Sequence, residues 1–449
     1  MTIGTTAHPT LERRLGLRAA IAIVVGEVIG VGIFLTPAEM AKGLGSPLWL
    51  LIVWLVMGTM ALCGALCFGE LAARWPEAGG QYVYLRETYG LRWAFLYGWM
   101  AMLVMDPGIT AALAVGFAQY AGYAVPMGPL AAKGAAMAAI IVLAALNIVG
   151  LRQSAGVVRA LTVLKVGFLA FLAVWAFGGQ LGDMGHFAPF ATRPADAGPL
   201  FGALAGGLVG AFFAFGGWWD LSKLGGEVKD ARRTLPRAMI WGVGIVTAVY
   251  IVTSAAFIYL VPLTAVGDGE AFVARVGEVL FGTAGGRLFA GIVIVSVLGS
   301  LAGLLMAAPR VYYAMAEDGV FFRALGAVDP RWHTPARAIA VQAVLGCVLV
   351  ALGTFDAILA YFIFTVVLFL AGTAAAVIVQ RRRSGPPEGF AMPLYPLPPI
   401  VFLVLTAVML FLFLGGGPMQ ALAGLAVTAL GLPVYEVVRR ARDNVPRTS

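Results

Sequence analysis

Residues 26–34 read Gly-Glu-Val-Ile-Gly-Val-Gly-Ile-Phe, and residues 212–219 read Phe-Phe-Ala-Phe-Gly-Gly-Trp-Trp. Glycines are common where membrane helices pack closely, so either cluster alone favours close packing. The two clusters, however, lie in the first and the sixth of the long apolar segments. An inverted repeat of five helices produces broken helices at these two places, facing each other near the middle of the bilayer. Together, the clusters therefore predict two discontinuous helices.

The composition indicates a membrane protein. Of the 449 residues, 61% are hydrophobic and only 12% are charged, about half the charged fraction of a soluble domain. A spanning helix needs about 20 mostly apolar residues, because its backbone groups must be satisfied within the helix. Twelve stretches meet this requirement, at residues 17–41, 46–73, 92–124, 132–150, 157–178, 200–222, 236–262, 283–315, 337–353, 355–380, 394–414 and 418–438. We therefore expect an all-α polytopic membrane protein with no soluble domain.

The basic residues predict the orientation. Of the 30 Lys and Arg residues, 24 fall in the loops on the side of the N-terminus, Lys165 lies within a span, and the five on the other side are Lys42, Lys133, Arg193, Arg275 and Arg287. The positive-inside rule places both termini in the cytoplasm. The first segment contains Glu27 and runs too long for a signal peptide, so we interpret it as a retained helix. The segments 263–282 and 317–337 are predicted to be short amphipathic pieces outside the spans.

Broken helices predict the kind of substrate. A half-helix that begins inside the membrane presents unpaired N–H groups and the positive end of its dipole, both of which favour a carboxylate. A half-helix that ends there offers carbonyl groups to an ammonium. The pair suits a zwitterionic amino acid.

Several stretches resemble the amino acid, polyamine and organocation transporter superfamily, and within it the permeases similar to L-type amino acid transporters. They are residues 30–34 with Pro37, residues 213–218, the loop Glu227-Val228-Lys229 with residues 232–238, and residues 309–319. The resemblance extends from Leu15 to about Arg440. It implies one transporter domain over residues 1–449 that works by alternating access. Its fold would be a core of two inverted five-helix repeats at about 17–178 and 200–380, with peripheral helices at about 394–438.

The resemblance also implies roles for particular residues. The substrate carboxylate would meet the N–H groups of residues 30–32, and the amino group would meet carbonyls of Val28, Phe213 and Gly216. Phe213 would act as an aromatic lid. The predicted substrate site comprises Val28, Ile29, Gly30, Val31, Gly32, Phe213, Ala214, Phe215, Gly216 and Trp218. Its apolar lining favours a neutral amino acid over arginine or a polyamine, although Trp219 is as consistent with packing.

Charged residues within the spans point to coupling or gating. Lys165 matches a lysine that relatives place beside the break in helix one, where sodium-coupled relatives hold a cation, and Tyr250 matches a tyrosine of the same network. A fixed ammonium implies transport without sodium. A charge in the bilayer costs about 3 kcal/mol, so Lys165 also stands out without the resemblance, although its role could be a structural tie between helices.

The roles of two acids inside the spans remain open. Glu27 departs from the small or polar residue that relatives carry, and it could pair with Lys165, carry a coupling proton, or attract a cationic substrate group. Asp106 precedes Pro107, and it could satisfy backbone groups that the proline frees.

The sequence argues against other classes of protein. His8, His186 and His333 lie in predicted loops without metal spacing, and neither a nucleophile motif nor a phosphate loop is present. We therefore expect no enzyme activity, cofactor or metal. Cys63, Cys67 and Cys347 lie in apolar segments and predict packing rather than disulfides. The loop at residues 121–131 lacks the cysteine that joins eukaryotic relatives to a heavy chain, so no covalent partner is expected. The transported amino acid, the choice between symport and exchange, and the oligomeric state stay open.

Overall fold

The computed structural model describes residues 13, 15–30, 32–149, 155–194, 198–262, 272–327, 329, 331–332, 334–353, 355–416 and 418–443. Within these ranges almost every residue is helical, and no strand is present apart from two isolated bridges, Leu15 with Val228 and Ala78 with Leu224. The predicted all-α class is therefore confirmed.

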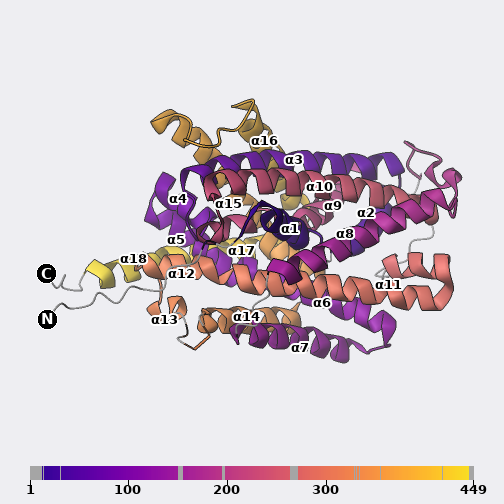
Figure 1. Ribbon diagram of the computed structural model, residues 1–449, viewed down its shortest axis with the longest axis horizontal. Coiled ribbons are helices and arrows are strands. Elements are labelled where there is room, and N and C mark those ends of the chain that lie inside the picture. Colours follow the sequence, from indigo (N-terminus) through magenta and orange to yellow (C-terminus); the bar gives the residue numbers. More distant parts are fainter. Residues whose placement is uncertain are drawn as a thin grey trace.

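The helices follow one another with short connections (Figure 1). Those of the first half are α1 (Leu17–Val28), α2 (Gly32–Leu44), α3 (Pro47–Arg74), α4 (Gln81–Tyr89), α5 (Leu91–Met100), the π-helix η1 (Ala101–Met105), α6 (Asp106–Ala124), α7 (Pro129–Ile148), α8 (Ala155–Gly178) and the 3-10 turn η2 (Met184–Phe187). Those of the second half are α9 (Leu200–Phe215), the 3-10 turns η3 (Asp220–Lys223) and η4 (Gly225–Glu227), α10 (Ala231–Leu260), α11 (Phe272–Ala307), α12 (Pro309–Glu317), α13 (Arg323–Gly326), α14 (Ala336–Leu352), α15 (Phe355–Ser384), α16 (Leu397–Gly416), α17 (Pro418–Ala429) and α18 (Gly431–Asp443).

Most of the predicted spans correspond to one long helix or to a continuous pair of helices. Among the described residues, 9 helices are long and apolar enough to cross a membrane, and the bent pair α1 and α2 raises the number to 10. The helix α14 and most of α16 are apolar but shorter. These elements coincide with the twelve predicted stretches, and the exact number that cross a bilayer stays a prediction.

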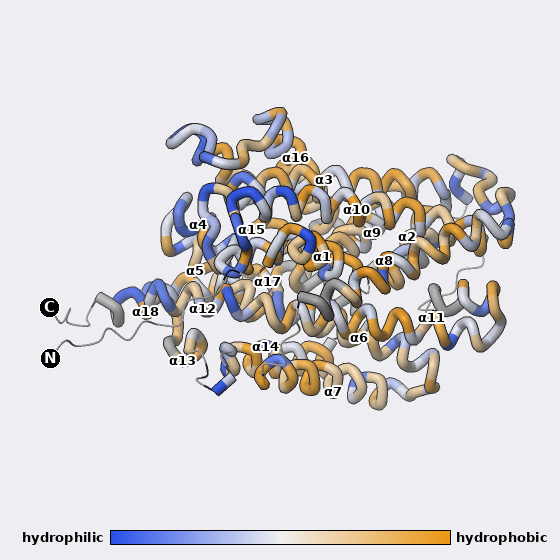
Figure 2. The backbone as a smooth tube through the Cα atoms, in the orientation of Figure 1, coloured by the Kyte–Doolittle hydropathy of each residue, from blue (hydrophilic) through white to orange (hydrophobic). Residues whose placement is uncertain are grey.

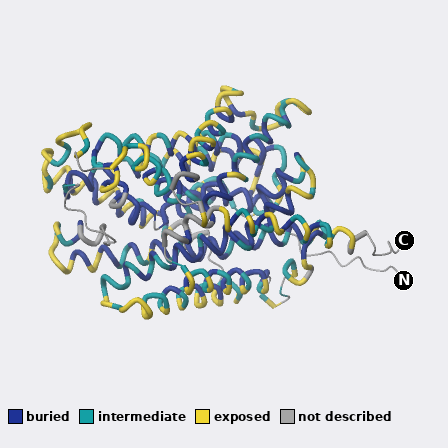
Figure 3. Tube along the Cα trace, turned by 180° about the vertical axis from the view of Figure 1, so that it is seen from behind, coloured by how far each residue is buried: buried dark blue, intermediate teal, exposed yellow. Residues whose placement is uncertain are grey.

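The outer helices expose apolar side chains, as lipid-facing helices do. Along α8, Val163, Phe171, Val174 and Trp175 are all exposed. Figure 3 shows that buried residues lie along the middle of the bundle and exposed residues lie on its outer helices and at its ends. Hydrophilic residues gather at the end that holds α4, α18 and the last turn of α15 (Figure 2). Apolar area of this kind is unfavourable in water, so the surface fits a hydrocarbon surrounding.

Helices that lie five spans apart pack against each other. The most extensive contacts join α3 with α10, α6 with α11, α2 with α9, and α1 with α10, and the next in extent join α7 with α14. Of these pairs, all except α1 with α10 contain one helix from each half of the chain at equivalent positions. A two-fold axis between two inverted repeats would produce this pattern.

The segment before the eighth predicted span ends at a glycine. Gly282 has φ 67° and ψ −166° inside α11, which separates Phe272–Phe281 from the long helix that follows. Only glycine adopts this conformation without strain. The described part of the predicted amphipathic segment 263–282 is therefore a separate short helix.

Candidate substrate-binding site

The first helix is interrupted where its glycines predicted. The helix α1 ends at Val28, Ile29 leaves helical geometry with φ −75° and ψ 69°, and α2 begins at Gly32 at an angle of 40° to α1. The N–H of Gly30 donates to the carbonyl of Val28 at 2.7 Å. Val31 lies outside the described residues.

The sixth helix is interrupted at its glycine pair. The helix α9 ends at Phe215, Gly216 has φ −56° and ψ 146°, and Gly217 has φ 105° in the left-handed region. The chain then continues as the 3-10 turns η3 and η4 instead of resuming an α-helix. The N–H of Gly216 donates to the carbonyl of Phe213 at 3.1 Å. The break is therefore real, but its second half is a tight turn rather than a half-helix.

The two breaks touch, and glycine makes this possible. A Cβ on Gly32 would lie 2.4 Å from the Cα of Ala214, and a Cβ on Gly217 would lie 3.3 Å from the Cβ of Glu27. The first distance is shorter than any real contact between carbon atoms, so no larger residue fits at position 32 unless the backbone moves. The glycines thus bring the two interrupted helices into direct contact.

Tyr250 of α10 joins the two breaks. Its buried hydroxyl lies 2.9 Å from the carbonyl oxygen of Val28 and 2.8 Å from that of Ala214. Since a hydroxyl has one proton to donate, the two carbonyls share it. Tyr250 therefore holds the carbonyl ends of α1 and α9 at a fixed separation.

Lys165 of α8 also binds α1, next to its break. Its ammonium donates to the carbonyl of Gly26 at 3.0 Å and to the hydroxyl of Ser300 at 2.9 Å, and Ser300 itself donates to Gly26 at 3.0 Å. The side chain is buried. The lysine thus satisfies a carbonyl in the last turn before the break and links α1, α8 and α11.

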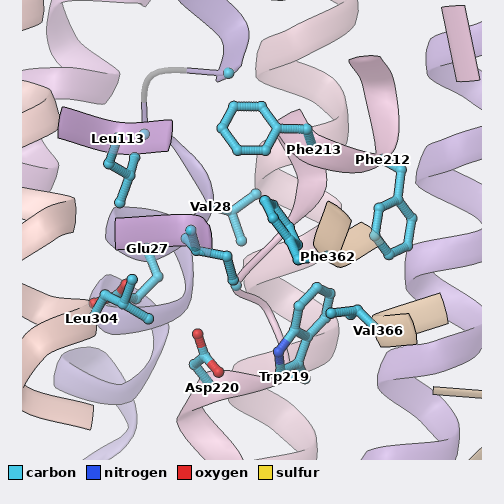
Figure 4. Close-up of a pocket in the computed structure, with 15 residues that line it drawn as sticks. Glu27, Val28, Leu113, Phe212, Phe213, Trp219, Asp220, Leu304, Phe362 and Val366 are labelled. Atoms are coloured by element: carbon cyan, nitrogen blue, oxygen red, sulfur yellow. The ribbon is translucent and has the colours of Figure 1, made fainter. Parts of the chain in front are cut away.

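A cavity lies where the two breaks meet (Figure 4). Its walls comprise Glu27, Val28, Gly30, Gly32, Ile109, Leu113, Phe212, Phe213, Gly216, Gly217, Trp219, Asp220, Leu304, Phe362 and Val366. The walls are mostly apolar, and the exceptions are the two acids and the backbone of the breaks. Convergent polar groups in an apolar cavity are typical of a small-molecule site.

Four residues of the predicted set do not line this cavity. Ile29 is fully buried, and its carbonyl accepts from Ser296 at 3.4 Å. Ala214 abuts Gly32. Phe215 packs edge-on to Tyr250 with ring centroids 5.1 Å apart. These three side chains pack around the two helix breaks and do not face the cavity.

The fourth residue, Trp218, lies next to a second, smaller cavity that Trp219 also lines. Trp218 packs edge-on against Phe68 of α3 with ring centroids 5.1 Å apart, and Trp219 lines the cavity between the breaks in its place. The positive φ of Gly217 turns the chain just before the two tryptophans, so helical periodicity does not continue across the break.

The site also holds a buried ionic cluster that the sequence analysis missed. The ammonium of Lys223 lies 2.8 Å from a carboxylate oxygen of Asp220 and 3.5 Å from one of Asp106, and all three side chains are almost fully buried. The hydroxyl of Tyr312 in α12 donates to the other oxygen of Asp106 at 2.5 Å. We call these four residues the ionic cluster.

The ionic cluster changes the interpretation of Asp106. Its carboxylate binds Lys223 and Tyr312, so it does not satisfy backbone freed by Pro107. Pro107 follows the π-helix η1, which contains the carbonyls of the preceding turn that its missing N–H leaves free. A π-turn is a common accommodation at functional sites in helices.

Metal ligands are not gathered at this site. Across the part of the chain that the structure describes, no group of three or more His, Cys, Asp or Glu side chains could hold a metal ion. The ammonium groups of Lys165 and Lys223 are the cations present in the described cluster around the breaks.

Comparisons with known proteins identify the family. The family model described as amino acid permease matches residues 15–431. The chain is 33% identical over 434 residues to the serine/threonine exchanger SteT of Bacillus subtilis, an alignment that covers 95% of this chain and 96% of that protein. It is 29% identical over 378 residues to the human b(0,+)-type amino acid transporter 1, with 83% and 77% covered. It is also 29% identical over 437 residues to the rat large neutral amino acids transporter small subunit 2, with 95% and 80% covered.

These relatives are transporters, and the matched region contains both helix breaks, the cavity and the ionic cluster. The chain therefore belongs to the amino acid permease family of the amino acid, polyamine and organocation superfamily, and it is an amino acid transporter of the membrane.

Proposed function

We propose that the chain transports neutral L-amino acids across the plasma membrane by alternating access, without sodium, through proton symport or amino acid exchange. The observation that carries this proposal is the meeting of two interrupted helices around an apolar cavity. The backbone of residues 30–32 is the proposed carboxylate site, and the carbonyls of Val28, Phe213 and Gly216 are the proposed amine site. The name of the relative SteT, a serine/threonine exchanger, supports a small neutral substrate and exchange.

The proposed site requires local rearrangement when substrate binds. The N–H of Gly30 and the carbonyl of Val28 bind each other at 2.7 Å, and Val28 also accepts from Tyr250. A carboxylate that takes the N–H of Gly30 would release the Val28 carbonyl for the substrate ammonium. Both ends of a zwitterion would thus be satisfied by opening one short backbone contact.

In this proposal, Lys165 is the reason that transport does not require sodium. Its ammonium lies beside the carbonyl of Gly26, in the last turn before the break. A second cation at the same carbonyl would be repelled by the fixed positive charge. Lys165 would then hold α1 in place through transport, with Tyr250 on the opposite side.

The proposed orientation follows from charge. The end of the bundle that holds α4, α18 and the last turn of α15 carries Arg381, Arg382 and Arg383. We propose that this end faces the cytoplasm of an inner membrane and that both termini lie on that side. We also propose that the chain works without a covalent heavy chain, and that residues 17–178 and 200–380 form the two repeats.

A second candidate is a cationic amino acid or polyamine exchanger. The observation in its favour is that Glu27 and Asp220 both line the cavity. Against it, Lys165 and Lys223 lie close enough to interact electrostatically with Glu27.

Purified protein in lipid vesicles tests the proposal. Vesicles loaded with unlabelled L-serine should take up labelled L-serine by exchange in sodium-free buffer, and other small neutral amino acids should compete. Competition by arginine or putrescine alone would instead support the cationic candidate. Equal uptake by protein-free vesicles, across all twenty amino acids, would contradict both.

A further inference from the structure

The buried charges beside the cavity do not balance. Three acids and two lysines are gathered there, namely Glu27, Asp106, Asp220, Lys165 and Lys223. If all five were ionised, one negative charge would remain uncompensated. An uncompensated charge inside a membrane protein is costly, so such a group attracts a counter-charge or a proton.

The contacts indicate which of the three acids carries the uncompensated negative charge. Asp106 and Asp220 share Lys223, and Asp106 also accepts from Tyr312. Lys165 directs its ammonium to Gly26 and Ser300. Among the described residues, the carboxylate of Glu27 makes neither a hydrogen bond nor an ion pair. It packs against Gly303 of α11, where an added Cβ would fall 1.9 Å from its oxygen.

Glu27 is also the acid that a proton can reach. It lines the cavity and is only partly buried, whereas Asp106 does not line the cavity and the side chains of Asp106 and Asp220 are almost completely buried. Figure 4 shows Glu27 and Asp220 on neighbouring walls of the cavity, with Phe213 at a distance from both. The charge of Asp220 acts directly on Glu27.

Each element that packs against α1 carries a polar or charged side chain toward the end of α1 that holds Glu27. These side chains are Lys165 of α8, Tyr250 of α10, Ser296 and Ser300 of α11, and Asp220 and Lys223 of η3. The nearest negative neighbour is Asp220, and the two lysines are partly committed to other oxygens. A neutral Glu27 removes the repulsion from Asp220, and both lysines keep the oxygens that they already bind.

We propose that Glu27 binds one proton together with each neutral amino acid, and that Asp220 sets how readily it does so. This inference rests on the proposed function. The proton comes from water on the side from which the substrate enters, forms an O–H bond on the carboxylate, and leaves to water on the other side. One positive charge therefore moves with each zwitterion. The fixed lysines take no part in the transfer.

A pH gradient across vesicles tests this proposal. In amino-acid-free vesicles at zero membrane potential, an outside pH one unit lower should drive wild-type accumulation of L-serine up to about tenfold, the limit for one proton per substrate. E27Q should exchange L-serine for L-serine but should accumulate none. D220N should still accumulate L-serine, with an altered dependence on the outside pH, because the second acid on the cavity wall is then neutral. E388Q, in an exposed loop, is the matched control and should behave as wild type.

The outcomes separate the two proposals. Exchange without gradient-driven accumulation in the wild type, or full accumulation by E27Q, would overturn the proton site and leave the transport function standing. Failure to exchange any amino acid would overturn the function and the proton site with it. If E27Q does not fold, the wild type in detergent still decides: at a pH high enough for Glu27 to be ionised in the substrate-free protein, L-serine should cause uptake of about one proton per bound substrate from weakly buffered solution, and no proton uptake at any pH would contradict the proposal.

Discussion

Two lysines lie buried in elements that contact the first helix, and their partners differ. Lys165 donates to neutral oxygens, the carbonyl of Gly26 and the hydroxyl of Ser300. Lys223 lies between two carboxylates, 2.8 Å from Asp220 and 3.5 Å from Asp106. A carbonyl and a hydroxyl do not neutralise an ammonium, whereas two carboxylates more than neutralise it.

The difference in partners indicates that the two lysines have different roles. Lys165 stands beside the break in helix one, so its charge acts on whatever binds there. Lys223 ties the non-helical turn after helix six to α6, and through Asp106 to Tyr312 of α12. We therefore expect Lys165 to matter most for transport and Lys223 to matter most for stability. Substitutions at the two lysines and at their partners test this contrast.

The largest effect on transport is expected from K165A. The substitution removes the charge and two hydrogen bonds at the break, and it leaves the carbonyl of Gly26 with Ser300 as a partner. Exchange of L-serine should fall to the level of protein-free vesicles, while the protein should still be purified as a folded species. K229A, at an exposed lysine, serves as the matched control. Wild-type exchange by K165A would remove Lys165 from the mechanism.

The largest effect on stability is expected from K223M. It leaves Asp106 and Asp220 buried without their shared cation, and removal of one partner from a buried ion pair typically costs about 3–5 kcal/mol. The free energy of unfolding in detergent, followed by tryptophan fluorescence, measures this cost. Addition of D220N to K223M should recover part of the loss, because one uncompensated charge is then gone. No recovery would mean that the cluster is not held by charge.

The two lysines also differ in how readily the sequence reveals them. Lys165 stands inside an uninterrupted apolar run, where a charge is conspicuous. Asp220 lies in the last turn of the predicted span 200–222 and Lys223 directly after it, where charged residues are ordinary and do not stand out. The fold could be predicted because the length of the apolar segments reflects the thickness of the bilayer. The paired glycines in the first and sixth segments reflect the inverted repeat. The ionic cluster joins residues from distant segments, and no local pattern encodes that contact.

The same reason explains why Trp219, rather than the predicted Trp218, lines the cavity between the two breaks. The sequence predicts that the helix breaks, but the direction of the chain after the break depends on the φ of 105° at Gly217 and on its contact with Glu27. One left-handed residue reverses which of two adjacent side chains faces the cavity. Tertiary contact, rather than local propensity, decides it.

A smaller loss of stability is expected from Y312F. The hydroxyl of Tyr312 donates to the carboxylate of Asp106 at 2.5 Å, and hydrogen bonds to charged groups contribute about 1.5–3 kcal/mol. The free energy of unfolding should fall by an amount in that range, with little change in L-serine exchange per folded molecule. A loss as large as that of K223M would show that Tyr312, rather than the lysine, holds the cluster together.

The smallest effect is expected from S300A, which removes the neutral partner of Lys165. A hydrogen bond between neutral groups contributes about 0.5–1.5 kcal/mol, and a bond to an ammonium somewhat more. Lys165 keeps the carbonyl of Gly26, so exchange of L-serine should fall several-fold but should remain above background. Unfolding and exchange are measured on the same preparation. If S300A abolished exchange as K165A does, the hydroxyl would be as necessary as the charge, and Lys165 would act as a member of a hydrogen-bonded tie rather than as a fixed cation at the break.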